Sequence, residues 1–65
     1  MAATLRQTKE GDTKLSVRAV PGYDATLVTV RFGGGGHKGA AGASISLPLA
    51  KAAEAVRLVM EEVYP

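Results

Sequence analysis

Four consecutive glycines, Gly33–Gly36, lie in the middle of a chain of only 65 residues. A glycine inside a helix or strand costs roughly 0.5–1 kcal/mol relative to alanine, because its unfolded backbone has more freedom to lose. A domain of this size buries only about 60% of the surface that its unfolded chain exposes, so its stability is modest. The glycines therefore have to serve a purpose, and the segments on both sides of them have to supply one small core.

That purpose has three possible explanations. One is a flexible linker, but linkers are usually longer and contain serine, and here the flanking apolar segments need each other. The second is that the glycines only permit tight packing. The third is that backbone N–H groups without Cβ atoms around them turn toward phosphate, and a short helix beginning near Lys38 would add its positive end. The spacing Gly34-x-Gly36-x-x-Gly39 also fits the dinucleotide-binding fingerprint, but the chain is too short for that fold, so we treat this match as accidental.

Alternating side chains predict a β-hairpin before the glycines. Lys14–Val20 places apolar side chains on one face and polar ones on the other, which is the period of a half-buried strand. Thr4–Lys9 is a weaker strand pattern, and Glu10–Asp12 supplies the turn between the two. A third strand is predicted at Ala43–Leu47, where the alternation returns.

Two opposing signals overlap at Ala25–Phe32. Its β-branched residues favour a strand. Apolar residues at helical spacing, with Asp24 as N-cap and Gly33 as stop, favour a helix. Propensity alone predicts a strand.

The last element is predicted as an amphipathic helix capped by Ser46 or Leu47, with Pro48 in its first turn. Arg57 and Glu61 stand four residues apart on its outer side, a spacing that predicts an ion pair. The apolar residues expected to form its buried face are Leu49, Ala52, Ala53, Val56, Val59, Met60 and Val63.

Composition excludes several kinds of site. With no cysteine and one histidine, the chain cannot form a disulfide, a thiolate metal site or a metal site with two imidazoles. Residues 1–46 carry six bases and three acids, an excess too small to hold long duplex DNA but sufficient for a short anionic ligand. The sequence shows neither a secretory signal nor the apolar stretch of about 20 residues that a membrane span needs, so we expect a soluble, cytoplasmic protein without a membrane partner.

Three basic side chains are candidates for phosphate binding. His37 could donate to an oxyanion from either ring nitrogen, Lys38 could add charge, and Arg18 could bind a phosphate through two parallel hydrogen bonds. Each also has an ordinary alternative: a structural histidine, a solvated lysine and an exposed strand arginine.

The segment Phe32–Ala43 resembles the signature loop of the DHH-associated type 1 domain, the C-terminal substrate-binding part of DHH-family phosphoesterases. Lys14–Arg18 is similar to the strand that precedes this loop in the family, with Ser16 and Arg18 at the expected positions. The resemblance covers about residues 4–64 and is closest to the nanoRNase and 3′-phosphoadenosine 5′-phosphate phosphatase group, followed by RecJ-like exonucleases. It implies a helix before the glycines. The expected fold is then α+β, with a small mixed sheet of about three strands, a short helix before the glycine-rich loop and a long C-terminal amphipathic helix.

For function, the resemblance implies a division of labour. The family's DHH domain holds a divalent metal, typically Mn²⁺, and hydrolyses the phosphodiester or 3′-phosphate. Because this chain has no Asp-His-His, residues 1–65 would be one substrate-binding domain excised from a larger phosphoesterase, inactive alone and without its own metal. Its ligands would be short single-stranded RNA or DNA or nucleotide phosphates. The residues implied in substrate binding are Ser16, Arg18, Gly33, Gly34, Gly35, Gly36, His37 and Lys38.

A related alternative is an RNA- or tRNA-binding module without a catalytic partner, such as the glycine-rich tail of alanyl-tRNA synthetases.

Overall fold

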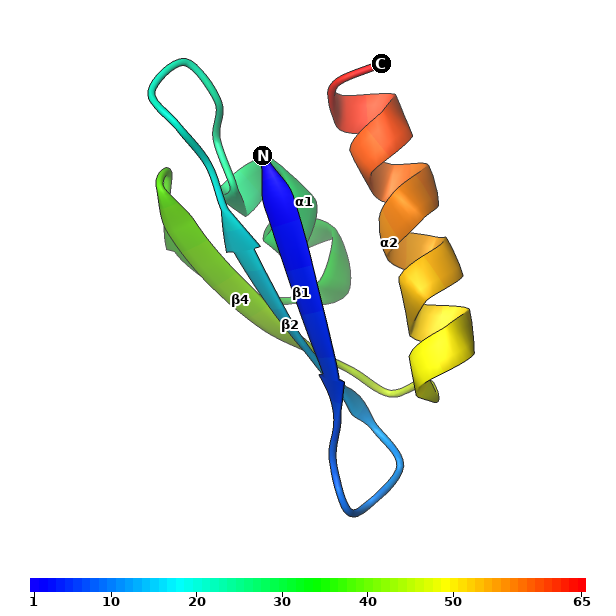
Figure 1. Ribbon diagram of the computed structural model, residues 1–65. Coiled ribbons are helices and arrows are strands. Elements are labelled where there is room, and N and C mark those ends of the chain that lie inside the picture. The colour runs from blue at the N-terminus through cyan, green and yellow to red at the C-terminus, as the bar shows by residue number, and fades with distance from the viewer.

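One layer of the structure is an antiparallel sheet, and the other consists of helical segments packed on one face of that sheet (Figure 1). The computed structural model describes all 65 residues. The sheet has four strands in the order β1-β2-β4-β3. Their bounds are β1 Ala2–Gln7, β2 Thr13–Arg18, β3 Gly35–His37 and β4 Ala40–Ile45. The predicted α+β class is confirmed, with one strand more than expected.

The predicted hairpin is formed by β1 and β2, which pair in register from Ala2 opposite Arg18 to Gln7 opposite Thr13. Leu15 and Val17 are buried beneath the helices, while the alternate residues Lys14, Ser16 and Arg18 are exposed, so the alternation is confirmed. The strand β2 also pairs with β4 along its whole length, which places it inside the sheet.

The segment before the glycines is helical, so the strand expected from propensity is wrong and the helix implied by the family resemblance is right. Helix α1 spans Thr26–Thr29, and a turn of 3-10 helix, η1, continues it over Val30–Phe32. Burial of Ala25 and Val28 on one helical face outweighs the β-branched composition. Asp24 lies one residue before the N-cap, which is Ala25 and not Asp24 as predicted, and its carboxylate accepts hydrogen bonds from the backbone N–H and the hydroxyl of Thr26 at 2.9 and 2.5 Å.

The C-terminal helix, α2, spans Leu49–Val63 and packs against α1 and β1. Neither Ser46 nor Leu47 caps it, because the extended backbone of Pro48 occupies the N-cap position and no side chain caps the helix there. Leu49 and Ala53 are exposed, contrary to the expected buried face. Since α2 packs chiefly against one helix and one edge strand, its fully buried stripe is limited to Ala52 and Val56, with Val59 and Met60 partly buried beside it.

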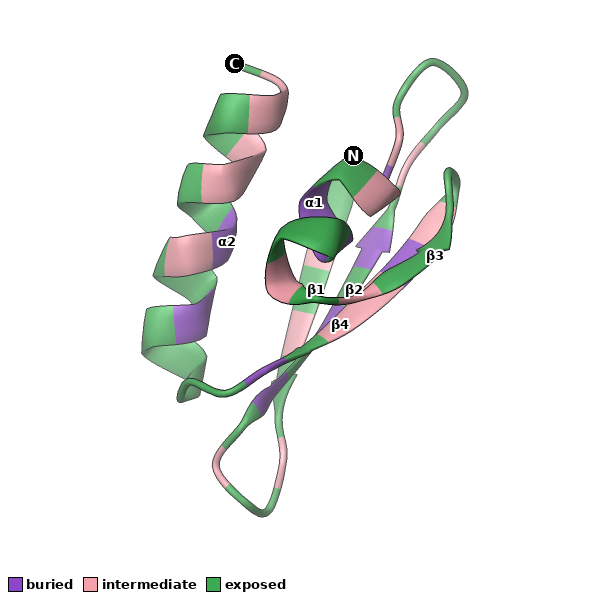
Figure 2. Ribbon diagram, turned by 180° about the vertical axis from the view of Figure 1, so that it is seen from behind, coloured by how far each residue is buried: buried purple, intermediate pink, exposed green.

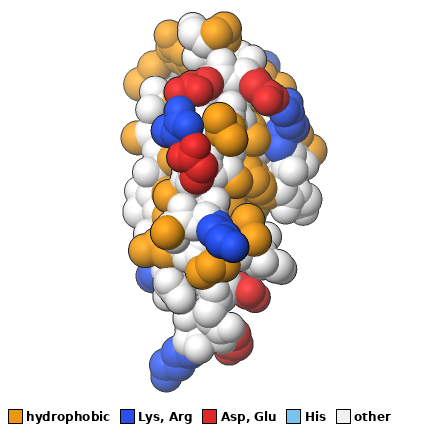
Figure 3. All heavy atoms as spheres, turned by 90° about the vertical axis from the view of Figure 1, so that its right-hand side faces the viewer, with side chains coloured by type: hydrophobic (Ala, Val, Ile, Leu, Met, Phe, Trp, Pro, Cys, Tyr) orange, Lys and Arg blue, Asp and Glu red, His pale blue; other side chains and the backbone are white.

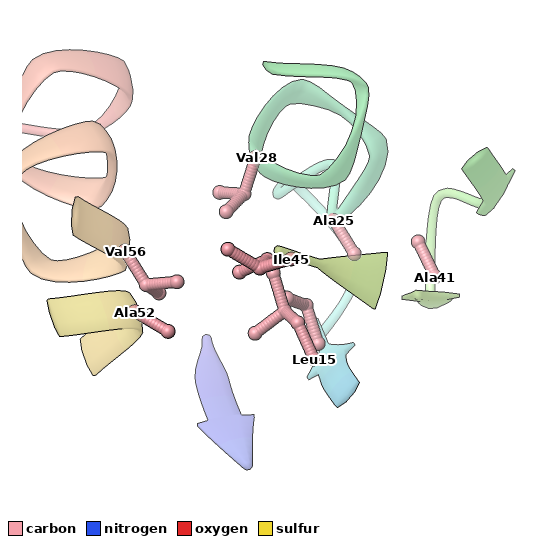
Figure 4. Packing of buried hydrophobic residues seen from close by; sticks show 8 residues of the cluster. Leu15, Ala25, Val28, Ala41, Ile45, Ala52 and Val56 are labelled. Atoms are coloured by element: carbon pink, nitrogen blue, oxygen red, sulfur yellow. The ribbon is translucent and has the colours of Figure 1, made fainter. Parts of the chain in front are cut away.

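The core between the two layers is small. Val28 of α1, Val56 of α2 and Ile45 of β4 point toward one another above Leu15 (Figure 4). Eight hydrophobic residues in all are buried. Neither helix is long and apolar enough to cross a lipid bilayer.

Candidate phosphate-binding face

Strand register brings most of the predicted site residues together. Arg18 of β2 lies opposite Ala40 of β4, and Ala40 lies opposite His37 of β3. Directly opposed residues in antiparallel strands point to the same face of the sheet. That face is the one away from the helices, which we call the outer face, and Figure 1 views the sheet from this side. Arg18 and His37, far apart in the sequence, are thus separated by only two strand spacings, about 9.5 Å.

A second row of the outer face lies beside the first. Ser16, Gly42 and Gly35 are register neighbours across the same three strands. Gly42 was not predicted, although the small residues of the Ala40–Ile45 strand at alternate positions were a signal for it. None of the three carries a side chain larger than serine, so the backbone beside Arg18 and His37 is not covered by large side chains.

The four glycines have different roles. Gly33 adopts a left-handed φ of 77° and ends η1, as predicted. A Cβ on Gly34 would lie 2.1 Å from the Gly42 carbonyl oxygen, and one on Gly36 would lie 2.6 Å from the Ala41 Cα. A Cβ on Gly35 would have no atom within 4 Å. Packing or backbone conformation therefore requires three of the glycines, and nothing within this chain requires the fourth.

The expected loop of free N–H groups is corrected by the structure. Gly35–His37 forms the edge strand β3 and pairs with β4, so part of its backbone hydrogen-bonding capacity is used in the sheet (Figure 2). No helix begins near Lys38, because Lys38 and Gly39 form the turn between β3 and β4. The Lys38 carbonyl instead accepts a hydrogen bond from the Ala25 N–H at 2.8 Å.

Charge on the outer face is unpaired. Arg18 and His37 are exposed and form neither a side-chain hydrogen bond nor an ion pair. The positive charge of Lys38 acts on Asp24, whose pKa is lowered chiefly by hydrogen bonds from Thr26 and further by this lysine. The charge of Lys38, in the turn between β3 and β4, therefore stabilises the ionised carboxylate of Asp24 just before α1.

The acids lie elsewhere in the fold. Glu54 and Glu61 flank Arg57 on α2, at 2.5 and 2.7 Å, and these ion pairs raise the arginine's pKa and lower that of Glu54. The predicted Arg57–Glu61 pair is therefore confirmed. Figure 3 shows acidic and basic side chains side by side on this flank of the molecule. The remaining acids, Glu10, Asp12, Asp24 and Glu62, lie outside the four strands. The strands themselves present only positive formal charge.

The site is an open surface. The largest hollow, of about 760 Å³, lies on another side, between β1 and α2, where Leu5, Val56, Met60 and Tyr64 are among its lining residues. No three histidine or acidic side chains are grouped closely enough to hold a metal ion. The family resemblance places its manganese in the DHH domain and not among the residues of this chain. The exposed, unpaired bases of the outer face are suited to binding an anion.

The sequence profile of the DHHA1 domain matches residues 1–64, which is nearly the whole chain. No curated protein and no solved structure matches this chain.

Proposed function

We propose that this chain, which belongs to the DHHA1 family, binds the phosphate groups of nucleotides or short single-stranded oligonucleotides. DHHA1 is the DHH-associated domain of DHH-family phosphoesterases. The observation that supports this proposal is the row formed by Arg18, Ala40 and His37 beside the bare backbone of Gly35. Arginine supplies two parallel donors for one phosphate, and histidine supplies one or two more, depending on its protonation.

Binding and hydrolysis are separated in this proposal. A DHH domain of the same parent protein, in the cytoplasm, holds Mn²⁺ and cleaves the phosphodiester or 3′-phosphate, as in nanoRNases or RecJ-like exonucleases. This chain orients the substrate by its phosphates. Because its binding face is open, an approaching catalytic domain can cover the substrate and exclude water from it.

Titration followed by nuclear magnetic resonance tests the proposal. On addition of 3′-phosphoadenosine 5′-phosphate or a 5′-phosphorylated dinucleotide, amide shifts should move at Arg18, Gly35 and His37. Arg18→Ala and His37→Ala should weaken binding several-fold. Lys51→Ala removes an exposed base on α2 that has no ion pair, and should leave the affinity unchanged.

Two results would count against this function. Shifts confined to α2 would place the ligand elsewhere. Binding of folded tRNA in preference to either short ligand would favour the non-catalytic RNA-binding module instead.

A further inference from the structure

The other end of the outer face carries a second cluster of bases. Arg6 of β1 lies opposite Lys14 of β2, and Lys14 lies opposite Ser44 of β4. All three side chains are exposed, and because Lys14 lies an even number of residues from Arg18 on β2, the register places them on the face that carries Arg18. Two like charges directly opposed on neighbouring strands are destabilising. The pair therefore lowers the stability of the sheet unless an anion lies between the two cations.

Neither cation is neutralised within the chain. All three ion pairs of the structure involve Arg31 or Arg57, which lie elsewhere. The nearest acids in sequence, Glu10 and Asp12, lie in the hairpin turn and pair with neither base. The Lys14 ammonium group donates to the Ser44 hydroxyl at 2.8 Å, a contact that directs it across the outer face.

The surface between the two ends is unobstructed. The intervening row consists of Thr4, Ser16, Gly42 and Gly35, none of which has a large side chain. Along β2, Lys14 and Arg18 are four residues apart, which corresponds to about 13 Å at 3.3 Å per residue. Successive phosphates of an extended single strand are roughly 6–7 Å apart, about twice the 3.4 Å rise of a duplex, so a strand of three to four nucleotides covers this distance.

We infer that Arg6, Lys14 and Ser44 form a second phosphate subsite, which binds the backbone of a single strand about four nucleotides long running along β2 from the Arg18 end. The inference rests on the proposed function, since the first phosphates of that strand occupy the row of Arg18 and His37. A mononucleotide or dinucleotide is too short to reach the second subsite. The Arg6 and Lys14 pair thus makes affinity depend on ligand length.

The test compares a 5′-phosphorylated dinucleotide with the corresponding tetranucleotide, on the full chain, by fluorescence anisotropy. The tetranucleotide should bind more tightly, and Arg6→Gln with Lys14→Gln should remove that gain while leaving dinucleotide affinity within about twofold. Each lost phosphate contact lowers the salt slope of log affinity for a single strand by about 0.7. The double variant loses one such subsite, so raising salt from about 50 to about 200 mM should weaken tetranucleotide binding about 2.6-fold more in the wild type than in the double variant.

Lys51→Gln is the matched control, because it removes an exposed base on α2 and should preserve both the length dependence and the salt slope. Equal affinity for the two ligands, an unchanged salt slope, or equal losses for both ligands in the double variant would overturn the second subsite. Failure of the proposed function looks different, because Arg18→Ala would then weaken neither ligand.

Discussion

Alanine at two adjacent glycines should have opposite effects on stability. In Gly34→Ala the new Cβ would lie 2.1 Å from the Gly42 carbonyl oxygen and 2.6 Å from the Ala43 Cβ, so β3 has to move away from β4. Forcing an extra carbon into a packed site costs typically about 1–3 kcal/mol. For 65 residues the whole free energy of unfolding is about 3–10 kcal/mol. A cost of about 2 kcal/mol would lower the Tm by about 8–16 °C.

Gly35→Ala places its methyl group in open space on the outer face, with an ordinary φ. Alanine reduces the freedom of the unfolded chain, so the free energy of unfolding should rise by about 0.4–1 kcal/mol. The same methyl group covers the backbone beside Arg18 and His37, and phosphate affinity should fall. Gly35→Ala is thus expected to be more stable and to bind less well.

Thermal and urea unfolding followed by circular dichroism, with a titration of the same samples, measures both effects. The reasoning is refuted if Gly34→Ala is as stable as the wild type, because β3 could not then lie against β4 as described. A Gly35→Ala protein that is destabilised as much as Gly34→Ala would also refute it. Unchanged binding in a stable Gly35→Ala protein would remove Gly35 from the site.

Three further predictions concern single side chains. Arg6→Gln relieves the repulsion with Lys14 and should raise the free energy of unfolding by about 0.2–1 kcal/mol at low salt but not at high salt; a rise independent of salt would contradict this. The folded-state pKa of Asp24 lies below its ordinary value of 3.8, so its contribution to stability is present above that pH and lost as the pH falls through the folded-state pKa. Asp24→Asn should reduce the fall of the urea unfolding midpoint at acid pH. An unchanged fall would mean that other carboxyl groups cause it. Tyr64→Phe leaves the Asp24 N–H without the hydroxyl that it contacts at 2.8 Å and should cost about 0.5–1.5 kcal/mol in urea unfolding, whereas a neutral result would mean that water replaces the hydroxyl.

Local patterns predicted the elements whose burial repeats along the chain. Alternation in Lys14–Val20 gave the correct face of β2, since one side of that strand meets the core and the other meets solvent. The helix α1 was ambiguous, because a four-residue helix is too short for periodicity to outweigh β-branched composition. Its conformation follows from tertiary burial of Val28 and from the end signals at Asp24 and Gly33.

The strand β3 could not be predicted from local sequence. Glycine is depleted in strands, and nothing within Gly35–His37 favours an extended backbone. Its pairing depends on β4, whose small residues allow the two backbones to approach closely. The family resemblance implied that Arg18 and His37 bind substrate, but it did not say how the two side chains lie relative to each other. The strand register places both residues opposite Ala40, and this register is a property of the whole sheet and not of either local sequence.

These observations change what the glycine run can mean for function. If backbone N–H groups alone bound phosphate, all four glycines would be candidates, yet Gly33, Gly34 and Gly36 are already required by the fold. Substituting any of those three would weaken binding simply by displacing β3 and with it His37. A loss of affinity at these positions therefore does not distinguish a binding role from a structural one. Only Gly35 and the side chains of the outer face separate the two, because they can be changed while the pairing of β3 with β4 stays intact.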